Sequence, residues 1–174
     1  MMCKLDEIKK MNFKITWKLI KIGYTGYKFM QPQINKQEIC EYAYSLLEKM
    51  ECNYEYIAQL IGEKENDYEF NQLLDKLSKL DSSDTELQYQ KWIIYLTKKL
   101  IESLDDNELE NLLNITEFWI SLGQPDNSPH IFQAVGNKIT PEAYYTKEMY
   151  DLILHRHLEW IEKETQKIIQ LESR

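Results

Sequence analysis

Apolar residues recur at intervals of three and four positions through most of this chain, which is the spacing of an amphipathic helix. Helix start signals accompany the pattern. Asn35 is followed three residues later by Glu38, as in a capping box, and Asn53 is the expected cap of the next helix. The expected helices span about residues 5–22, 35–50, 53–62, 67–80, 87–101, 105–123 and 141–174.

About seven helices joined by short connections predict an all-α fold, a multi-helix bundle. The 174 residues suffice for one substantial core and are too few for two comfortable domains. We therefore expect a single domain over residues 1–174, in which residues 1–12 could be a loosely attached N-terminal segment. Gly23, Gly26 and Pro32 are expected to end the first helix.

One amphipathic helix is expected at residues 105–123. Asp105 or Asp106 is the expected cap at its start, and Gly123 is the expected stop. The apolar side chains of this helix are expected to face inward. They are Leu109, Leu112, Leu113, Thr116, Trp119 and Ile120.

The segment from residue 123 to 141 has no helical pattern, and it holds three of the four prolines. Connections this long are uncommon in compact domains, and they are usually functional or mobile. Polar side chains of such a segment can hydrogen-bond its own backbone and hold its shape. We expect this structural role for Asp126, Ser128, Pro129, His130, Gly136 and Asn137, with Gly136 and Asn137 forming a turn. A catalytic role is the alternative, although no nucleophile elbow or acid partner accompanies His130.

The remaining histidines do not have metal-ligand spacing. His155 and His157 lie about 200° apart around a helix, so they cannot readily share a metal. We expect His157 at the edge of the core with a satisfied hydrogen bond, and His155 paired with Glu159 on the surface. Cys3, Cys40 and Cys52 are an odd number without C-x-x-C spacing, which favours reduced thiols. No metal and no cofactor are expected.

The chain is acidic, with 21 basic against 29 acidic residues and a formal net charge of −8. Repulsion from phosphates makes nucleic acid and anionic membranes unfavourable partners, whereas a basic protein would be attracted. The sequence shows no secretory signal and no apolar run of about 18 residues, so a cytoplasmic location is expected.

Two acidic clusters are the candidate surface for such a partner. Each lies near the start of an expected helix, where carboxylates also favour the helix dipole. We predict that they bind a basic protein, with charge giving speed and neighbouring aromatic side chains giving affinity. The clusters are Glu63, Glu65, Asp67 and Glu69, and Asp105, Asp106, Glu108 and Glu110.

The C-terminal half of the chain contains the motifs Trp119-Ile-Ser-Leu-Gly-Gln-Pro-Asp-Asn-Ser-Pro-His130, Gly136-Asn137, Pro141, Tyr144-Tyr145 and His157-Leu-Glu-Trp160-Ile161. With these motifs the chain resembles an uncharacterised bacterial all-helical family that is treated as immunity proteins of polymorphic or contact-dependent toxin systems. The resemblance covers most of the chain from about Phe13 onward. It implies a helical, non-enzymatic protein that neutralises a cognate basic toxin domain, with a nuclease as the toxin that charge favours. A general helical interaction or regulatory module, or an enzyme using residues 126–130, are the alternatives, and the oligomeric state stays open.

Overall fold

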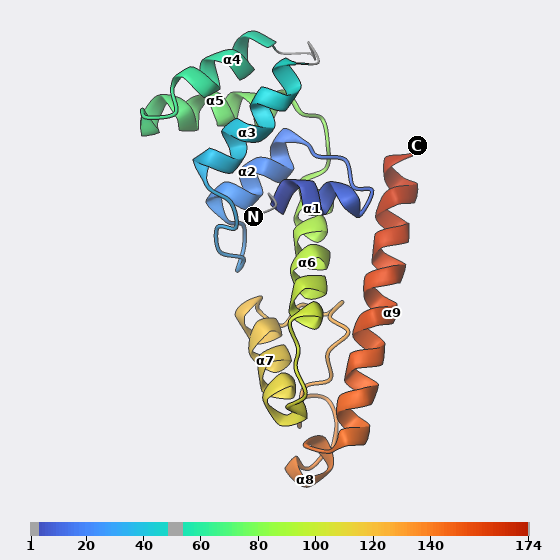
Figure 1. Cartoon of the computed structure of the whole chain (residues 1–174). Helices are drawn as coiled ribbons and strands as arrows, with labels where there is room; N and C mark the ends of the chain where they lie inside the picture. The colour runs from blue at the N-terminus through green and yellow to red at the C-terminus, as the bar shows by residue number, and fades with distance from the viewer. Residues whose placement is uncertain (1–3, 49–53, 174) are drawn as a thin grey trace. The chain divides into compact units, whose positions relative to one another are not determined.

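The computed structural model is built of α-helices, as the sequence predicts (Figure 1). It describes residues 4–48 and 54–173, so Cys3, Cys52 and the expected cap Asn53 lie outside the described residues. Over the described part there are nine helices and no strand. They are α1 (Lys4–Lys10), α2 (Trp17–Thr25), α3 (Lys36–Leu47), α4 (Tyr54–Gly62), α5 (Asp67–Leu80), α6 (Thr85–Glu102), α7 (Glu108–Ser121), α8 (Pro141–Tyr144) and α9 (Lys147–Glu172).

The count exceeds seven because two expected helices are each divided. The first is interrupted after α1 at Asn12, whose φ of 64° lies in the left-handed region and ends the helical run. Thr16 then caps α2, since its side chain accepts a hydrogen bond from the Leu19 amide. Near the C-terminus, α8 begins at Pro141 as expected and is followed by the separate helix α9.

The chain divides into two compact units. Unit 1 comprises Met1–Tyr27, Gln31–Trp92 and Leu171–Arg174. Unit 2 comprises Lys28–Met30 and Ile93–Gln170. That the two units together form the single domain expected from chain length stays a prediction.

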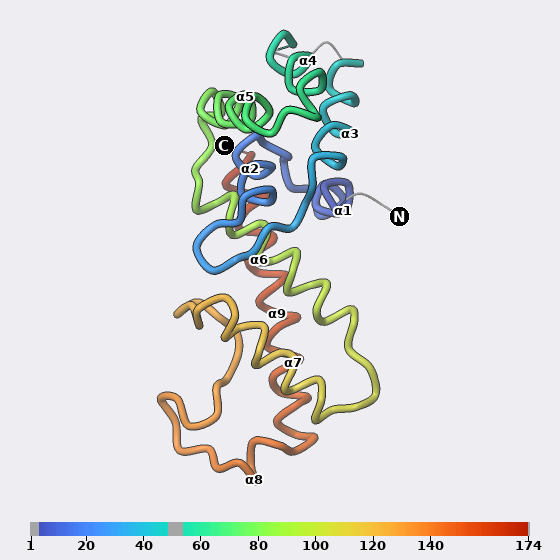
Figure 2. Tube along the Cα trace, turned by 90° about the vertical axis from the view of Figure 1, so that its left-hand side faces the viewer, coloured from blue at the N-terminus to red at the C-terminus, as the bar shows by residue number. Residues whose placement is uncertain are grey.

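Unit 1 packs α2 against α5, α4 against α3 and α5, and α1 against α3 (Figure 2). The predicted capping box is confirmed, because the Asn35 side chain accepts from the Glu38 amide while the Glu38 carboxylate accepts from the Asn35 amide. Residues 4–10 are not loosely attached. Leu5 and Ile8 are fully buried, so α1 belongs to the core of this unit.

Trp92 is the largest side chain in the core of unit 1, and it explains why Gly23 does not end α2. A Cβ atom on Gly23 would lie 2.2 Å from Cζ2 of Trp92, so the indole occupies the space that any other residue would fill. The indole Nε1 also donates to the Leu19 carbonyl at 2.8 Å. Helix α2 ends instead at Gly26, which has a φ of 78°.

A buried lysine lies beside this core. The Lys91 side chain is fully buried, and its ammonium donates to Glu172 Oε1 at 2.6 Å, Gln88 Oε1 at 2.7 Å and the Lys14 carbonyl at 2.8 Å. Burial lowers the pKa of Lys91, while the Glu172 carboxylate opposes that shift. Three acceptors satisfy the three N–H groups, as a buried charge requires.

Unit 2 is organised around the inner face of α7. Leu112, Ile115 and Trp119 of that helix are buried together with Ile153 and His157 of α9. The irregular segment runs from α7 to α8, as Figure 2 shows.

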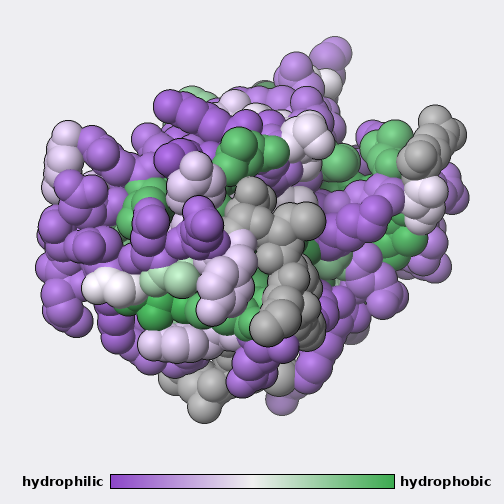
Figure 3. All heavy atoms as spheres, turned by 90° about the horizontal axis from the view of Figure 1, so that it is seen from above, coloured by the Kyte–Doolittle hydropathy of each residue, from purple (hydrophilic) through white to green (hydrophobic). Residues whose placement is uncertain are grey.

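The surface is mixed in hydropathy. In the space-filling view of Figure 3, hydrophilic side chains cover most of the visible face and hydrophobic areas are small and separate. Among residues 4–48 and 54–173, no helix is both long enough and apolar enough to span a membrane.

Candidate functional site

The irregular segment is held against α9 through its backbone. Trp160 Nε1 donates to the Asn127 carbonyl at 2.9 Å, and Arg156 Nε donates to the Pro129 carbonyl at 2.9 Å. Within the segment, the Ser128 hydroxyl accepts from the His130 amide at 3.1 Å. Side chains of a rigid helix thus satisfy carbonyls that regular structure leaves unpaired.

The turn predicted at Gly136 and Asn137 is confirmed. Gly136 has a φ of 66°, a backbone angle that favours glycine. The side-chain Nδ2 of Asn137 donates to the carbonyls of Phe132 and Val135 at 2.8 and 2.9 Å. The Asn137 side-chain oxygen accepts from the Ile139 amide. One side chain therefore closes the turn on both sides.

His130 lies inside unit 2, with 6% of its surface exposed. Its Nε2 is 3.0 Å from the Thr116 hydroxyl of α7 and 3.2 Å from the Tyr144 hydroxyl of α8. Thr116 donates its proton to the Leu112 carbonyl and Tyr144 donates to the Ile131 carbonyl, so Nε2 must be the donor and carry the proton. The imidazole therefore joins the segment to α7 and α8, whereas we expected it to bond the segment's own backbone.

His157 is a second buried histidine, 5.7 Å from His130 between ring centroids. Its Nδ1 donates to the Ile153 carbonyl at 2.6 Å and its Nε2 accepts from Trp119 Nε1 at 2.7 Å. The predicted satisfied hydrogen bond is confirmed, although the ring is fully buried and not at the core edge.

Both rings are neutral at pH 7. Burial lowers the pKa of His130 to about 3, with further lowering from His157 and Arg156. Burial likewise lowers the pKa of His157 to about 4. A base this weak is poorly matched to proton abstraction at neutral pH. The exposed Asp126 makes no hydrogen bond with His130 in the part of the chain that the structure describes. These features favour a structural role for His130.

On the surface, the predicted pair of His155 and Glu159 is confirmed, with 3.2 Å between Nε2 and Oε1. Cys40 is a free thiol and is buried, which raises its pKa. Over the described ranges, no three side chains of His, Cys, Asp and Glu converge as metal ligands.

The acidic residues before and within α7 have different roles. The cap is Asn107, whose side chain accepts from the Glu110 amide, so the expected cap at Asp105 or Asp106 is wrong. Asp105 instead accepts from the Asn107 amide at 2.8 Å, which shapes the preceding turn. Glu108 forms an ion pair of 2.6 Å with Lys147. Asp106 is exposed and has no ion pair among the described residues, which leaves its charge available to a partner.

The outer face of α7 differs from the prediction. Leu109, Leu113 and Ile120 are 53%, 43% and 51% exposed, although all three were expected to face inward. At 100° per residue they fall within about 40° of one another, so they form one stripe on the helix. Glu110 and Glu117 lie about 40–60° further round than Leu113, so carboxylates flank the stripe. We call Leu109, Leu113, Ile120, Asp106, Glu110 and Glu117 the α7 face.

Phe29 extends this apolar surface at the end of α7. Its ring is 62% exposed and lies over Gly123, where an added Cβ atom would be 2.5 Å from Phe29 Cδ2. Gly123 also has a φ of 78° directly after the helix, as the predicted stop requires. The glycine therefore both ends α7 and admits the phenylalanine ring.

The acidic cluster of unit 1 is partly neutralised. The Lys36 ammonium pairs with Asp67 and also donates to the Lys64 carbonyl at 3.1 Å. Asn66 caps α5 by accepting from the Glu69 amide. Two lysines thus lie among the four carboxylates Glu63, Glu65, Asp67 and Glu69. The α7 face, where exposed apolar side chains accompany the carboxylates, is the stronger candidate site.

Sequence reasoning identified Asp106 and Glu110 of the α7 face as partner-binding but missed its apolar stripe, although a signal for the stripe was present. The apolar residues of α7 cover more of its circumference than one buried stripe needs, because Leu112 and Trp119 already form the inner face. The additional apolar side chains, those of Leu109, Leu113 and Ile120, had to be either buried by another element or exposed to solvent.

The chain belongs to a bacterial family described as an uncharacterized protein conserved in bacteria (DUF2247), whose model matches residues 5–165. No curated protein and no solved structure matches the chain.

Proposed function

We propose that this member of an uncharacterised bacterial family is an immunity protein, which binds and blocks a basic toxin domain through the α7 face. The observation that carries the proposal is the stripe of Leu109, Leu113 and Ile120, exposed on a helix and flanked by carboxylates. Exposed apolar patches with a polar rim are typical of protein-binding sites.

Charge and apolar contact have separate roles in this proposal. Unit 2 holds thirteen acidic and eight basic residues, so it attracts a basic domain from a distance. Full burial of three half-exposed aliphatic side chains contributes about 3 kcal/mol, at about 1 kcal/mol each. Tight inhibition needs more than this, so the interface extends beyond the stripe, with the exposed Phe29 over Gly123 as a further anchor.

The test is co-expression with the toxic C-terminal domain that a neighbouring gene would encode in such a system. We expect the chain to restore growth of cells that make this domain, and to form a complex with it in solution. Association should slow markedly between about 50 mM and 500 mM salt, because screening shortens the range of attraction to a few ångströms.

Variants of the α7 face make the test specific. Leu113→Asp should shorten the lifetime of the complex, and Glu117→Lys should slow its formation, because apolar contacts hold a complex and charge steers it. Glu162→Lys, an exposed position on α9, is the matched control for the charge change. Normal protection by both α7 variants would refute the proposed surface. The absence of any toxic neighbouring gene product would favour a general interaction module.

A further inference from the structure

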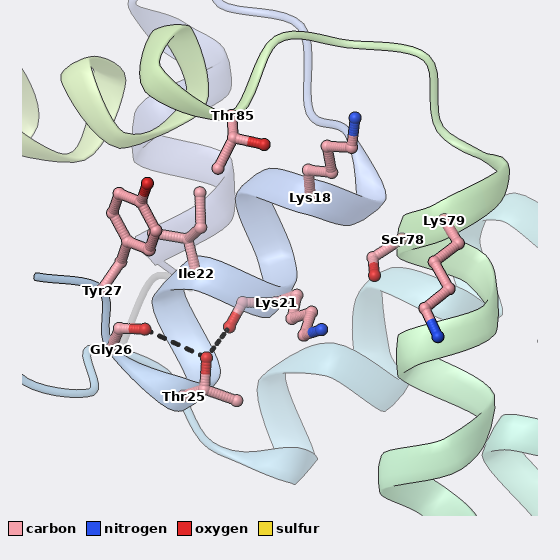
Figure 4. Close-up of a pocket in the computed structure, with 9 residues that line it drawn as sticks. All are labelled: Lys18, Lys21, Ile22, Thr25, Gly26, Tyr27, Ser78, Lys79 and Thr85. Carbon is pink, nitrogen blue, oxygen red and sulfur yellow. Dashed lines mark hydrogen bonds between the residues drawn. The ribbon is translucent and has the colours of Figure 1, made fainter.

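A cavity of about 440 Å³ lies in unit 1, lined by residues of α2, α5 and the first turn of α6 (Figure 4). This volume is within the range of small-molecule sites, about 300–1,000 Å³. The cavity belongs to neither of the acidic clusters, and the α7 face contributes nothing to it.

The charge of the cavity is opposite to that of the protein. Three lysines, Lys18, Lys21 and Lys79, are among its lining residues and no acidic residue is, although the carboxylates of Asp75 and Glu86 contact the lining side chains Lys21 and Tyr27. The whole chain carries a net charge of −8, whereas the charged side chains that line this cavity are all lysines. Such a wall favours an anionic ligand.

The three ammonium groups are not equally available. Lys18 donates to the Ser83 carbonyl, and Lys21 pairs with Asp75 at 2.6 Å, which leaves two of its three donors. Lys79 has no ion pair or hydrogen bond with any residue that the structure describes. In Figure 4 the Lys21 and Lys79 side chains and the Ser78 hydroxyl lie on one side of the cavity. Lys21 and Lys79 are therefore the cations that a ligand would meet.

A hydroxyl and a helix end add to this positive character. Thr85 is the first residue of α6, and its hydroxyl has no partner among the described residues. The start of an 18-residue helix carries a partial positive charge. Asp84 accepts from the Leu87 amide at this helix start and Glu86 lies in its first turn, so carboxylates already offset part of that charge. Thr85 contributes a hydroxyl donor to the cavity.

Ile22 and Tyr27 give the wall an apolar part that is held in place. Ile22 is 5% exposed, and the Tyr27 ring packs edge-on against Tyr89 with 5.3 Å between ring centroids. The Tyr27 hydroxyl donates to Glu86 at 2.8 Å, which holds the ring in position. A planar organic group could pack on this wall while its anionic end faces the lysines.

We infer that this cavity binds a small organic phosphate. The phosphate is held by Lys21, Lys79 and the Thr85 hydroxyl, and the organic part packs on Ile22 and Tyr27. Separate donors from α2, α5 and α6 suit the several oxygens of a phosphate better than the two oxygens of a carboxylate. The inference does not depend on toxin binding, because it uses no residue of unit 2.

Phenyl phosphate is a suitable probe, because it joins a planar ring to a phosphate. Binding is followed by calorimetry and by the amide signals of Thr25, Gly26 and Ser78 in NMR spectra of the full chain. We expect phenyl phosphate to bind more tightly than inorganic phosphate, which lacks the ring, and than phenol, which lacks the charge. Benzoate, with the ring and a carboxylate, should bind less tightly than phenyl phosphate.

Substitutions then test the residues. Lys21→Gln and Lys79→Gln should each weaken phenyl phosphate binding about fivefold or more, and the double variant should abolish it. Lys9→Gln removes an exposed positive charge of α1 away from the cavity and should leave binding unchanged. Thermal melting of each variant identifies any that fail to fold, and a correctly folded single variant suffices for the comparison. The inference is overturned if phenyl phosphate does not bind at about 10 mM, a concentration well above the dissociation constant of about 1 mM that marks weak binding. It is also overturned if the double variant binds phenyl phosphate as tightly as the unaltered chain does.

Discussion

The two buried histidines of unit 2 should make the stability of the protein depend on pH. His157 Nε2 accepts from Trp119 in a fully buried site, so a proton on that nitrogen would displace its donor. His130 has a buried Nδ1 without a hydrogen-bond partner among residues 4–48 and 54–173, and protonation there would place an unpaired N–H group in the core. Both rings therefore stay neutral while the protein is folded.

The sign and size of the effect follow from the pKa values. In the folded state these are about 3 for His130 and about 4 for His157. An unfolded histidine has a pKa of about 6.5, so below that pH the unfolded state binds more protons and stability falls as pH falls. At pH 5 an unfolded histidine is about 97% protonated. This protonation lowers the free energy of unfolding by about 2 kcal/mol per ring, and by about 4 kcal/mol for both rings.

Urea unfolding measured by circular dichroism at pH 7.5, 6.5, 5.5 and 5.0 tests this expectation. Carboxylates also titrate toward acid pH, so the difference between variants is the decisive quantity. His157→Gln and His130→Gln should each be less stable at pH 7.5, by about 1–3 kcal/mol, because hydrogen bonds of the ring are lost. Between pH 7.5 and pH 5, the free energy of unfolding of each variant should fall by about 2 kcal/mol less than that of the unaltered chain.

His155→Gln is the control, since that side chain is exposed and pairs with Glu159 on the surface. It should leave the pH dependence unchanged. If the buried-site variants and the control lose equal stability on acidification, the assignment of two neutral core histidines is wrong. Histidine ring signals in NMR spectra give a second readout, because those of His130 and His157 should not titrate above pH 5.

Two further predictions concern unit 1, and both can be measured by urea unfolding. Gly23→Ala should lower the free energy of unfolding by about 1–3 kcal/mol, because the new Cβ atom would clash with Trp92. Gly62→Ala, where a Cβ atom would meet no atom within 4 Å, should raise the free energy of unfolding by up to about 1 kcal/mol. Equal effects of the two substitutions would contradict the packing argument. Glu172→Ala should cost about 3–5 kcal/mol by leaving the Lys91 ammonium buried without its carboxylate, and adding Lys91→Met should recover a large part of that loss. A double variant no more stable than the single one would show that the buried charge is not the cause.

Features that depend on a few neighbouring residues could be predicted from the sequence. The capping box of Asn35 and Glu38, the start of α8 at Pro141 and the end of α7 before Gly123 all agree with the structure. Caps and stops are set by hydrogen bonds and backbone angles within about four residues. The all-α fold follows from the same local information, since apolar spacing reports helical geometry directly.

Features that depend on which elements meet could not be predicted in this way. Gly23 reads as a helix stop, but it lies inside α2 because Trp92, about 70 positions later in the chain, needs its space. His130 reads as part of a self-contained loop, but its partners come from α7 and α8. Periodicity showed that Leu113 lies on an apolar arc of α7 without showing that the side chain is 43% exposed.

The two candidate sites illustrate the same division. Composition alone established an acidic protein suited to basic partners, because net charge is a sum that needs no coordinates. Only the tertiary structure exposed the apolar stripe of α7, and only it brought Lys21 of α2 and Lys79 of α5 to one cavity. The physical reason is that burial and convergence are properties of packing between elements, whereas helix formation and charge are properties of the chain itself.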